Sequence, residues 1–269
     1  MIEALEFEFM RHALLAGLLT SIACGVIGSL VVVNKIVFIS GGVAHAAYGG
    51  IGIAFFLGIS PLIGAGVFAL FIALLIGIIT LNDKESSNTV IGVLWAAGMA
   101  VGIIFIDMTP GYNVDLLSYL FGSILTVPRS DLLLMLVLDI VIVLTVTLFY
   151  KDLLAMSYDE EFASLRGIPV NILYLVLLGL VALTVVMTIR VVGLILVIAL
   201  LTIPTYIAEK YAASLGKMMF WAFLLSTLFT FSGLWFSFTF NITSGASIII
   251  VAAAVFTVFQ VYHWLRRSL

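Results

Sequence analysis

One histidine, His45, lies well inside a long apolar run of the chain, at residues 36–57. The other two histidines, His12 and His263, lie near the ends of such runs. An ionisable side chain inside a bilayer is costly, and neutral imidazole is a common ligand for transition metals. The sequence therefore predicts that His45 contacts a metal ion. The alternative is a histidine that forms a hydrogen bond with a neighbouring carbonyl.

Asp139 is the second costly side chain, about half-way along the apolar run at residues 131–150. A carboxyl group at this depth is either hydrogen-bonded to a neighbouring helix or kept neutral by a proton. A further alternative is a proton relay, in which Asp139 or His45 carries protons for a secondary transporter. Asp139 is therefore a candidate residue of a translocation path, and its role stays open.

The sequence motifs of several enzyme classes are absent. Gly216-Lys217 has no glycine-rich phosphate loop before it, so the chain has no Walker A motif. It also has no HExxH or CxxC motif and no Ser-His-Asp order, and Cys24 is its only cysteine. We therefore expect a protein that is not an enzyme and binds no cofactor within this chain. If its work requires ATP, another subunit must hydrolyse it.

Membrane-spanning helices must position these residues. Of the 269 residues, 64% are hydrophobic and only 9% are charged, whereas a soluble domain has about 25% charged residues. This composition predicts an all-α, polytopic membrane protein, with one transmembrane domain over residues 1–269, lipid around it and no nucleic-acid partner. We expect eight or nine transmembrane helices, because a span needs about 20 residues. The nine candidate runs are residues 13–33, 36–57, 62–81, 90–106, 131–150, 170–189, 192–211, 218–236 and 244–265.

The second run also carries a face of small residues. Gly42, Ala46 and Gly49 or Gly50 recur there at helical spacing. Small residues allow the backbones of membrane helices to approach closely. The pattern predicts tight helix packing around His45.

The longest polar interruption of the chain is Lys151–Val170, which carries six of the 25 charged residues. A segment this polar lies in water rather than in hydrocarbon. Ser157 or Asp159 can cap a short helix there, with two glutamates in its first turn, and Gly167 can end it. A helix this short does not fold alone, so we interpret it as a surface presented to a partner. An ordinary solvated loop is the alternative.

The distribution of Lys and Arg predicts the orientation in the membrane. If Lys151–Val170 is cytoplasmic, eight of the 11 Lys and Arg residues lie inside, and only Arg11, Arg129 and Arg190 lie outside. The positive-inside rule then places the N-terminus outside the cell membrane and the C-terminus in the cytoplasm. On the outer side, the apolar stretch at residues 116–127 is too short to span, so we predict a re-entrant or interfacial helix there.

Five stretches carry a more specific signal. They are Glu161-Phe162-Ala163 with Gly167 four residues later, SGGVAHAAYGGIG, DLLSYLFGSIL, VVGLILVIALLTIPTYIA and NITSGASIIIVAAAVF. The first resembles the EAA-type coupling loop of ABC importers, which docks the ATP-hydrolysing subunit. Together, over nearly the whole chain, they resemble the membrane subunit of the zinc, manganese and iron ABC importers. The resemblance implies a type II-like permease in which residues 151–170 are the coupling loop, with ATPase contacts at Asp159, Glu160, Glu161, Ala163 and Gly167.

The resemblance also implies the partners and the activity. The partners are a second copy of the chain in a homodimer, two ATP-binding cassette subunits inside and an extracytoplasmic metal-binding protein. The implied activity is the import of a divalent transition metal ion (zinc, manganese or iron) by alternating access at the dimer interface, with His45 as a metal contact.

Two positions depart from the family's usual pattern. One helical turn before the histidine of the second span, where the family usually has an aspartate, this chain has Gly41. Asn241 stands where the motif of the last span usually begins with an aspartate. Both changes remove negative charge that would attract a divalent cation. Two alternatives therefore stay open: an ABC permease for another small solute, such as a chelated metal, and a proton-coupled secondary transporter.

Overall fold

The computed structural model of the chain is built from helices joined by short connections. It describes residues 6–82, 87–110, 116–194 and 197–268, and within these residues there is no strand. The helices are α1 (Glu8–Val33), α2 (Val37–Leu57), α3 (Pro61–Asn82), α4 (Ser87–Asp107), α5 (Leu116–Phe121), the 3₁₀ helix η2 (Ile124–Thr126), α6 (Arg129–Leu148), α7 (Tyr150–Tyr158), α8 (Glu160–Leu165), α9 (Val170–Val192), α10 (Val197–Glu209), α11 (Leu215–Phe240) and α12 (Ser244–Ser268).

Eight helices in the described part of the chain are long and apolar enough to cross a membrane, namely α1 to α4, α6, α9, α11 and α12. They confirm the predicted multi-pass helical architecture. The predicted full span at residues 192–211 is wrong. The helix there, α10, has 13 residues, which at about 1.5 Å per residue falls well short of the hydrocarbon core of about 30 Å. The reason is that α9 continues past Arg190 to Val192 and takes the beginning of that run.

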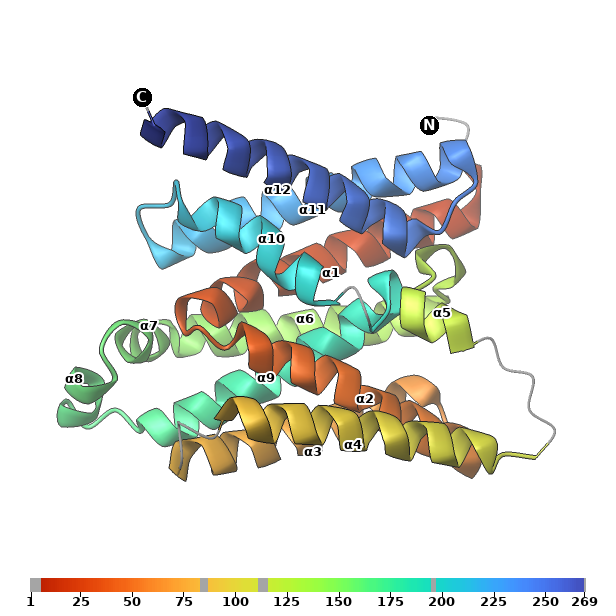
Figure 1. The fold of residues 1–269 in the computed structure, drawn as a ribbon, viewed down its shortest axis with the longest axis horizontal. Helices are drawn as coiled ribbons and strands as arrows, with labels where there is room; N and C mark the ends of the chain where they lie inside the picture. The colour runs from red at the N-terminus through yellow and green to blue at the C-terminus, as the bar shows by residue number, and fades with distance from the viewer. Residues whose placement is uncertain (1–5, 83–86, 111–115, 195–196, 269) are drawn as a thin grey trace.

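The long helices run back and forth between two ends of the molecule (Figure 1). The chain enters α1 at one end, and α12 finishes at the opposite end (Figure 1). The short helices α7 and α8 lie at the end where α12 finishes, whereas α5 lies at the end where α1 begins (Figure 1). Short helical structure is therefore confirmed at residues 116–127, as α5 followed by η2, and its re-entrant or interfacial position on the outer side stays a prediction. Lys84, which we counted for the orientation, lies outside the described residues.

Small residues set the distance between α2 and its neighbours. A Cβ atom at Gly49 would lie 2.7 Å from the carbonyl oxygen of Gly98 on α4. A Cβ atom at Gly50 would meet the carbonyl oxygen of Gly64 on α3. No larger side chain fits at these positions unless a backbone moves, so the predicted tight packing of α2 is confirmed. It holds the helix that carries His45 close against α3 and α4.

Three glycines from separate sequence motifs meet beside α5. Gly122 follows α5, Gly193 follows α9, and Gly245 lies in the first turn of α12. A Cβ atom at Gly193 would meet the backbone nitrogen of Gly122, and one at Gly245 would meet the carbonyl oxygen of Phe121. Three of the sequence stretches quoted above therefore form one tightly packed junction. We call it the glycine junction (Gly122, Gly193 and Gly245).

Candidate functional site

The polar segment contains two short helices, α7 and α8, where the sequence predicted one. Asp159 caps α8, because its Oδ1 accepts a hydrogen bond from the backbone N–H of Phe162 at 2.9 Å. The two glutamates that follow Asp159 lie in the first turn of α8, where the helix dipole favours negative charge. The capping role predicted for Asp159 is confirmed. Ser157 does not cap α8, because its hydroxyl donates instead to the carbonyl of Leu153 at 2.7 Å.

Helix α8 ends at Gly167, as predicted. The backbone N–H of Gly167 donates to Ser164 O at 2.9 Å, and that of Ile168 donates to Ala163 O at 3.1 Å. This pair of bonds is a Schellman motif, in which the residue after the helix takes a left-handed conformation and is usually glycine. Gly167 has φ +80°, and Ala163 is fully buried. The structure of α8 itself therefore explains why a small residue stands at Ala163 and a glycine at Gly167.

Several apolar side chains of α7 and α8 are exposed. Tyr158 is 70% exposed, Phe162 is 51% exposed and Leu165 is 88% exposed. The guanidinium group of Arg166 lies 5.1 Å from the centroid of the Phe162 ring. Apolar side chains gathered in a polar rim are typical of surfaces that bind another protein. We call this surface the docking surface (Tyr158, Glu160, Glu161, Phe162, Leu165 and Arg166).

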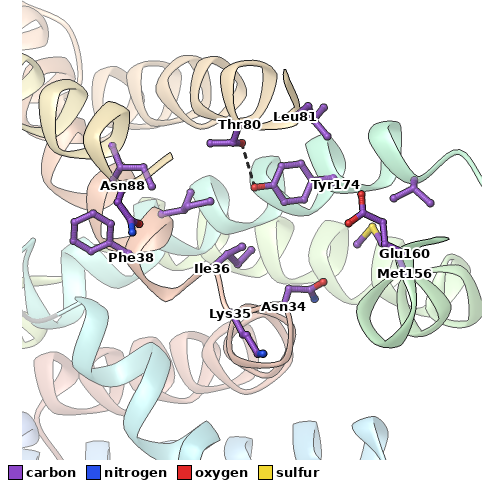
Figure 2. Close-up of a pocket in the computed structure, with 13 residues that line it drawn as sticks. Asn34, Lys35, Ile36, Phe38, Thr80, Leu81, Asn88, Met156, Glu160 and Tyr174 are labelled. Carbon is purple, nitrogen blue, oxygen red and sulfur yellow. Dashed lines mark hydrogen bonds between the residues drawn. The ribbon is translucent and has the colours of Figure 1, made fainter. Parts of the chain in front are cut away.

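A cavity of about 260 Å³ lies between this segment and the ends of α2 to α4. Figure 2 shows that its walls come from elements far apart in the sequence. The hydroxyl of Tyr174 on α9 lies 3.3 Å from that of Thr80 on α3, and this hydrogen bond closes one side (Figure 2). The remaining walls include Asn34 and Lys35 from the turn between α1 and α2, Phe38 from α2, Asn88 from α4, Met156 from α7 and Glu160 from α8.

His45 is half-buried on α2, against α4. Its Nδ1 lies 2.9 Å from the carbonyl oxygen of Gly41. A carbonyl can only accept, so Nδ1 carries the proton and Nε2 keeps the lone pair that can bind a metal. The ring of Trp95 stacks on the imidazole, with centroids 4.1 Å apart, and the Trp95 N–H donates to the sulfur of Met99 at 3.1 Å. The carbonyl bond predicted as an alternative is present, and metal binding by Nε2 stays a prediction.

Of the other predicted candidates, Gly41 reaches His45 only through its backbone carbonyl, and no hydrogen bond joins Asn241 or Asp139 to His45 in the described part of the chain. Gly41 packs against α10, where a Cβ atom would lie 2.5 Å from Cδ1 of Ile198. Asn241 is exposed and caps the end of α11 in a left-handed conformation. Asp139 is only 4% exposed, and neither of its carboxyl oxygens has a hydrogen-bond partner in the described part of the chain. The bond to a neighbouring helix that we considered for Asp139 is therefore absent there.

The described part of the chain does not form a metal site with several ligands either. Among the described residues, no group of three or more His, Cys, Asp or Glu side chains is placed to hold a metal ion. The sequence did not point to Trp95, whose ring stacks on His45, or to Met99, which accepts the hydrogen bond of the Trp95 N–H. Their spacing of one helical turn on α4 was the available signal.

Comparison with known proteins decides the identity. The sequence pattern of the ABC 3 transport family matches residues 6–263. The chain belongs to the ABC 3 transport family. It is 52% identical over 258 residues to an uncharacterized membrane protein of Synechocystis sp., covering 96% of this chain and 92% of that protein. It is 34% identical over 254 residues to the manganese transport system membrane protein MntC of Halalkalibacterium halodurans, covering 94% and 87%.

A solved structure agrees with this assignment. PsaBC from Streptococcus pneumoniae in complex with Fab matches with a TM-score of 0.86 and 32% identity, over 96% of this chain and 93% of that chain. The family assignment confirms the resemblance that we drew from the five motif stretches. The protein is a multi-pass membrane permease of an ABC transporter, and ATP is hydrolysed in a separate subunit.

Proposed function

We propose that this permease imports a divalent transition metal ion into the cytoplasm by alternating access, with manganese as the first candidate and zinc or iron as further ones. In this proposal two copies of the chain form the transmembrane path, and two ATP-binding subunits bind on the cytoplasmic side. An extracytoplasmic binding protein delivers the ion. The names of relatives such as the manganese import system permease protein ScaB of Streptococcus gordonii, 31% identical over 253 residues, support the choice of metal.

The docking surface is the observation that carries the proposal. It lies at the end of the molecule where α12 finishes (Figure 1). In the sequence count, which includes Lys84 from outside the described residues, eight of the 11 Lys and Arg residues belong to the same side of the membrane as Lys151–Val170, and the positive-inside rule favours the cytoplasm for that side. The caps at both ends of α8 hold it in one conformation. A side chain as apolar and exposed as Leu165, next to Phe162, is best explained by a protein that covers both. This supports an ATPase bound on the cytoplasmic side, with the N-terminus outside.

The position of His45 supports a path between two copies of the chain. An ionisable side chain in a membrane rarely faces lipid, yet His45 is only half-buried within its own chain. The neighbouring helix α4 exposes the small residues Ala96, Ala97 and Ala100, which suit close packing of membrane helices. A second copy on this surface would cover His45. One imidazole from each copy, without the acid that Gly41 replaces, holds an ion weakly enough to release it.

A chelated metal is the second candidate substrate. It is favoured by Gly41 and Asn241, because both stand where related permeases usually have an aspartate. A chelated ion brings its own ligands and needs less negative charge from the protein.

Uptake by proteoliposomes tests the proposal. The permease, its ATPase and its binding protein are reconstituted, and ATP-dependent entry of Mn²⁺ is measured near pH 7 with and without excess chelator. We expect uptake of free Mn²⁺, and a loss of about tenfold or more in His45→Ala, as for the removal of a metal contact. His263→Ala, at the far end of α12, is the matched control and should transport normally. Wild-type uptake by His45→Ala, or uptake only of the chelate, would contradict the free-ion path.

A further inference from the structure

Asn34 and Ser157 link the polar segment directly to the membrane bundle. Asn34 is the C-cap of α1, and its side-chain amide donates to the hydroxyl of Ser157 at 2.8 Å and to the carbonyl of Leu30 at 2.8 Å. The Ser157 hydroxyl donates in turn to the carbonyl of Leu153 at 2.7 Å. A continuous set of hydrogen bonds therefore runs from the backbone of α1 to the backbone of α7, across 123 residues of sequence.

The backbone beside Asn34 makes a rigid turn between α1 and α2. The N–H of Lys35 donates to Val32 O at 3.1 Å, and the N–H of Ile36 donates to Val31 O at 3.0 Å. This is the same Schellman motif that ends α8, here with Lys35 at φ +58°. Ile36 is buried, and α2 begins at the next residue. A displacement of Asn34 is therefore passed to the start of α2, about 12 Å along the helix from His45.

A cavity borders the polar segment (Lys151–Val170) on the side that faces the ends of α2, α3 and α4. The cavity described above separates Met156 and Glu160 from Phe38 and Asn88 (Figure 2). Polar contacts hold the two ends of α7 instead. At its start, the hydroxyl of Tyr150 accepts a hydrogen bond from the N–H of Gly216 on α11 at 3.0 Å. At its end, Ser157 binds Asn34. The Asn34 contact is therefore a direct polar link from the segment that carries the docking surface to the turn before α2.

We propose that Asn34 is a positioning residue that transmits movement of the docking surface to the turn between α1 and α2, and so to the helix that carries His45. This inference rests on the proposed function. When the ATPase moves α8, Ser157 moves with α7, and the Asn34 amide carries the turn with it. Without this bond the ATPase still binds and hydrolyses ATP, but less of its movement reaches the transport path.

The number of ions moved per ATP hydrolysed measures this transmission. The permease is reconstituted with its ATPase and its binding protein, and Mn²⁺ uptake and ATP hydrolysis are followed in the same proteoliposomes. Asn34→Ala should lower the number of ions per ATP about fivefold, the factor that corresponds to one hydrogen bond of about 1 kcal/mol, while ATPase binding stays normal. Ser157→Ala should give the same loss, and the double variant no more than either.

Two further variants make the test decisive. Ser157→Thr keeps the hydroxyl and should keep most of the coupling. Ser232→Ala removes an equivalent hydroxyl-to-carbonyl bond on an exposed face of α11 and should change nothing. If Asn34→Ala fails to fold, Ser157→Ala decides, because it leaves the bond from Asn34 to Leu30 in place. A wild-type number of ions per ATP in Ser157→Ala, or additive losses in the double variant, would overturn the inference. Absence of ATP-dependent uptake in the wild-type complex would instead refute the proposed function.

Discussion

Replacement of Gly193 by alanine tests the glycine junction. Gly193 has φ +80° and ψ +169°, a region that is open almost only to glycine and costs other residues about 1–3 kcal/mol. The added methyl group would also meet the backbone nitrogen of Gly122, and overpacking of this kind costs about 1–3 kcal/mol more. We therefore expect Gly193→Ala to lower the free energy of unfolding by roughly 2–6 kcal/mol, a large part of the total stability of a typical protein.

Two alanine substitutions of other glycines separate these two costs. Gly179 lies within α9, the helix that ends just before Gly193, in ordinary helical conformation. A Cβ atom at Gly179 would have Cδ1 of Leu70 as its nearest neighbour, at 3.6 Å. Gly179→Ala should therefore stabilise α9, by up to about 1 kcal/mol. Gly58 has φ +67° and open space around it, so Gly58→Ala should cost only about 1–2 kcal/mol.

The assay is circular dichroism of the purified proteins during titration with sodium dodecyl sulfate, which unfolds membrane helices. From the most to the least stable protein, the expected order is Gly179→Ala, wild type, Gly58→Ala and Gly193→Ala. If Gly193→Ala is as stable as Gly179→Ala, the close contact between Gly193 and Gly122 does not exist and the junction is refuted.

Three further predictions concern other parts of the chain. Asp139→Leu should raise the free energy of unfolding by about 1–3 kcal/mol in the same titration, because a buried carboxyl group without a partner is removed; a loss of stability would show that the carboxyl group has one. Gly167→Val should weaken retention of the ATPase more than Gly167→Asn does, since asparagine tolerates the left-handed conformation and valine does not; equal retention in co-purification would contradict this. In a Cys24→Ala background, an impermeant thiol reagent should label Met108→Cys but not Leu165→Cys in intact cells; the reverse pattern would invert the proposed orientation.

Local rules were sufficient to predict the two ends of α8, although the sequence predicted one short helix where α7 and α8 are present. The N-cap at Asp159 and the left-handed glycine at Gly167 depend on residues within one or two turns of each other, so their structural roles could be predicted from the sequence. The predicted cap at Ser157 was never more than one of two alternatives. Its hydroxyl donates instead to the carbonyl of Leu153 within α7 and accepts a hydrogen bond from Asn34. No local pattern indicates the contact with Asn34.

The number of spans was harder to predict than their existence. A hydropathy pattern shows where the chain is apolar, but it does not show where a helix begins and ends. The run at residues 192–211 is apolar enough to span, yet Val192 belongs to α9, Gly193 turns the chain, and α10 begins only at Val197. The turn at Gly193 is fixed by its contact with Gly122, which is 71 residues earlier in the sequence.

The same limit applies to the site around His45. Its cost inside a membrane marked it as a functional candidate, and the structure shows a ring with one nitrogen bonded and one available. The stacked ring of Trp95 comes from another helix, so it could not be predicted from the neighbourhood of His45. The sequence showed that Gly41 and Asn241 stand where the family usually has aspartates. Only the structure shows that these two positions lie in different parts of the fold.

Binding of the ATP-hydrolysing subunit to the docking surface tests the central claim most directly. The tagged permease is purified from cells that also produce its ATPase, and the amount of ATPase retained is measured for Leu165→Asp and for Lys151→Ala. Leu165 is 88% exposed, so Leu165→Asp leaves the packing of the permease intact. If the docking surface binds the ATPase, Leu165→Asp loses most of it, because a charge then occupies the apolar centre of the interface. Lys151→Ala, an exposed position at the start of α7, should retain it fully. Full retention by Leu165→Asp would contradict the account.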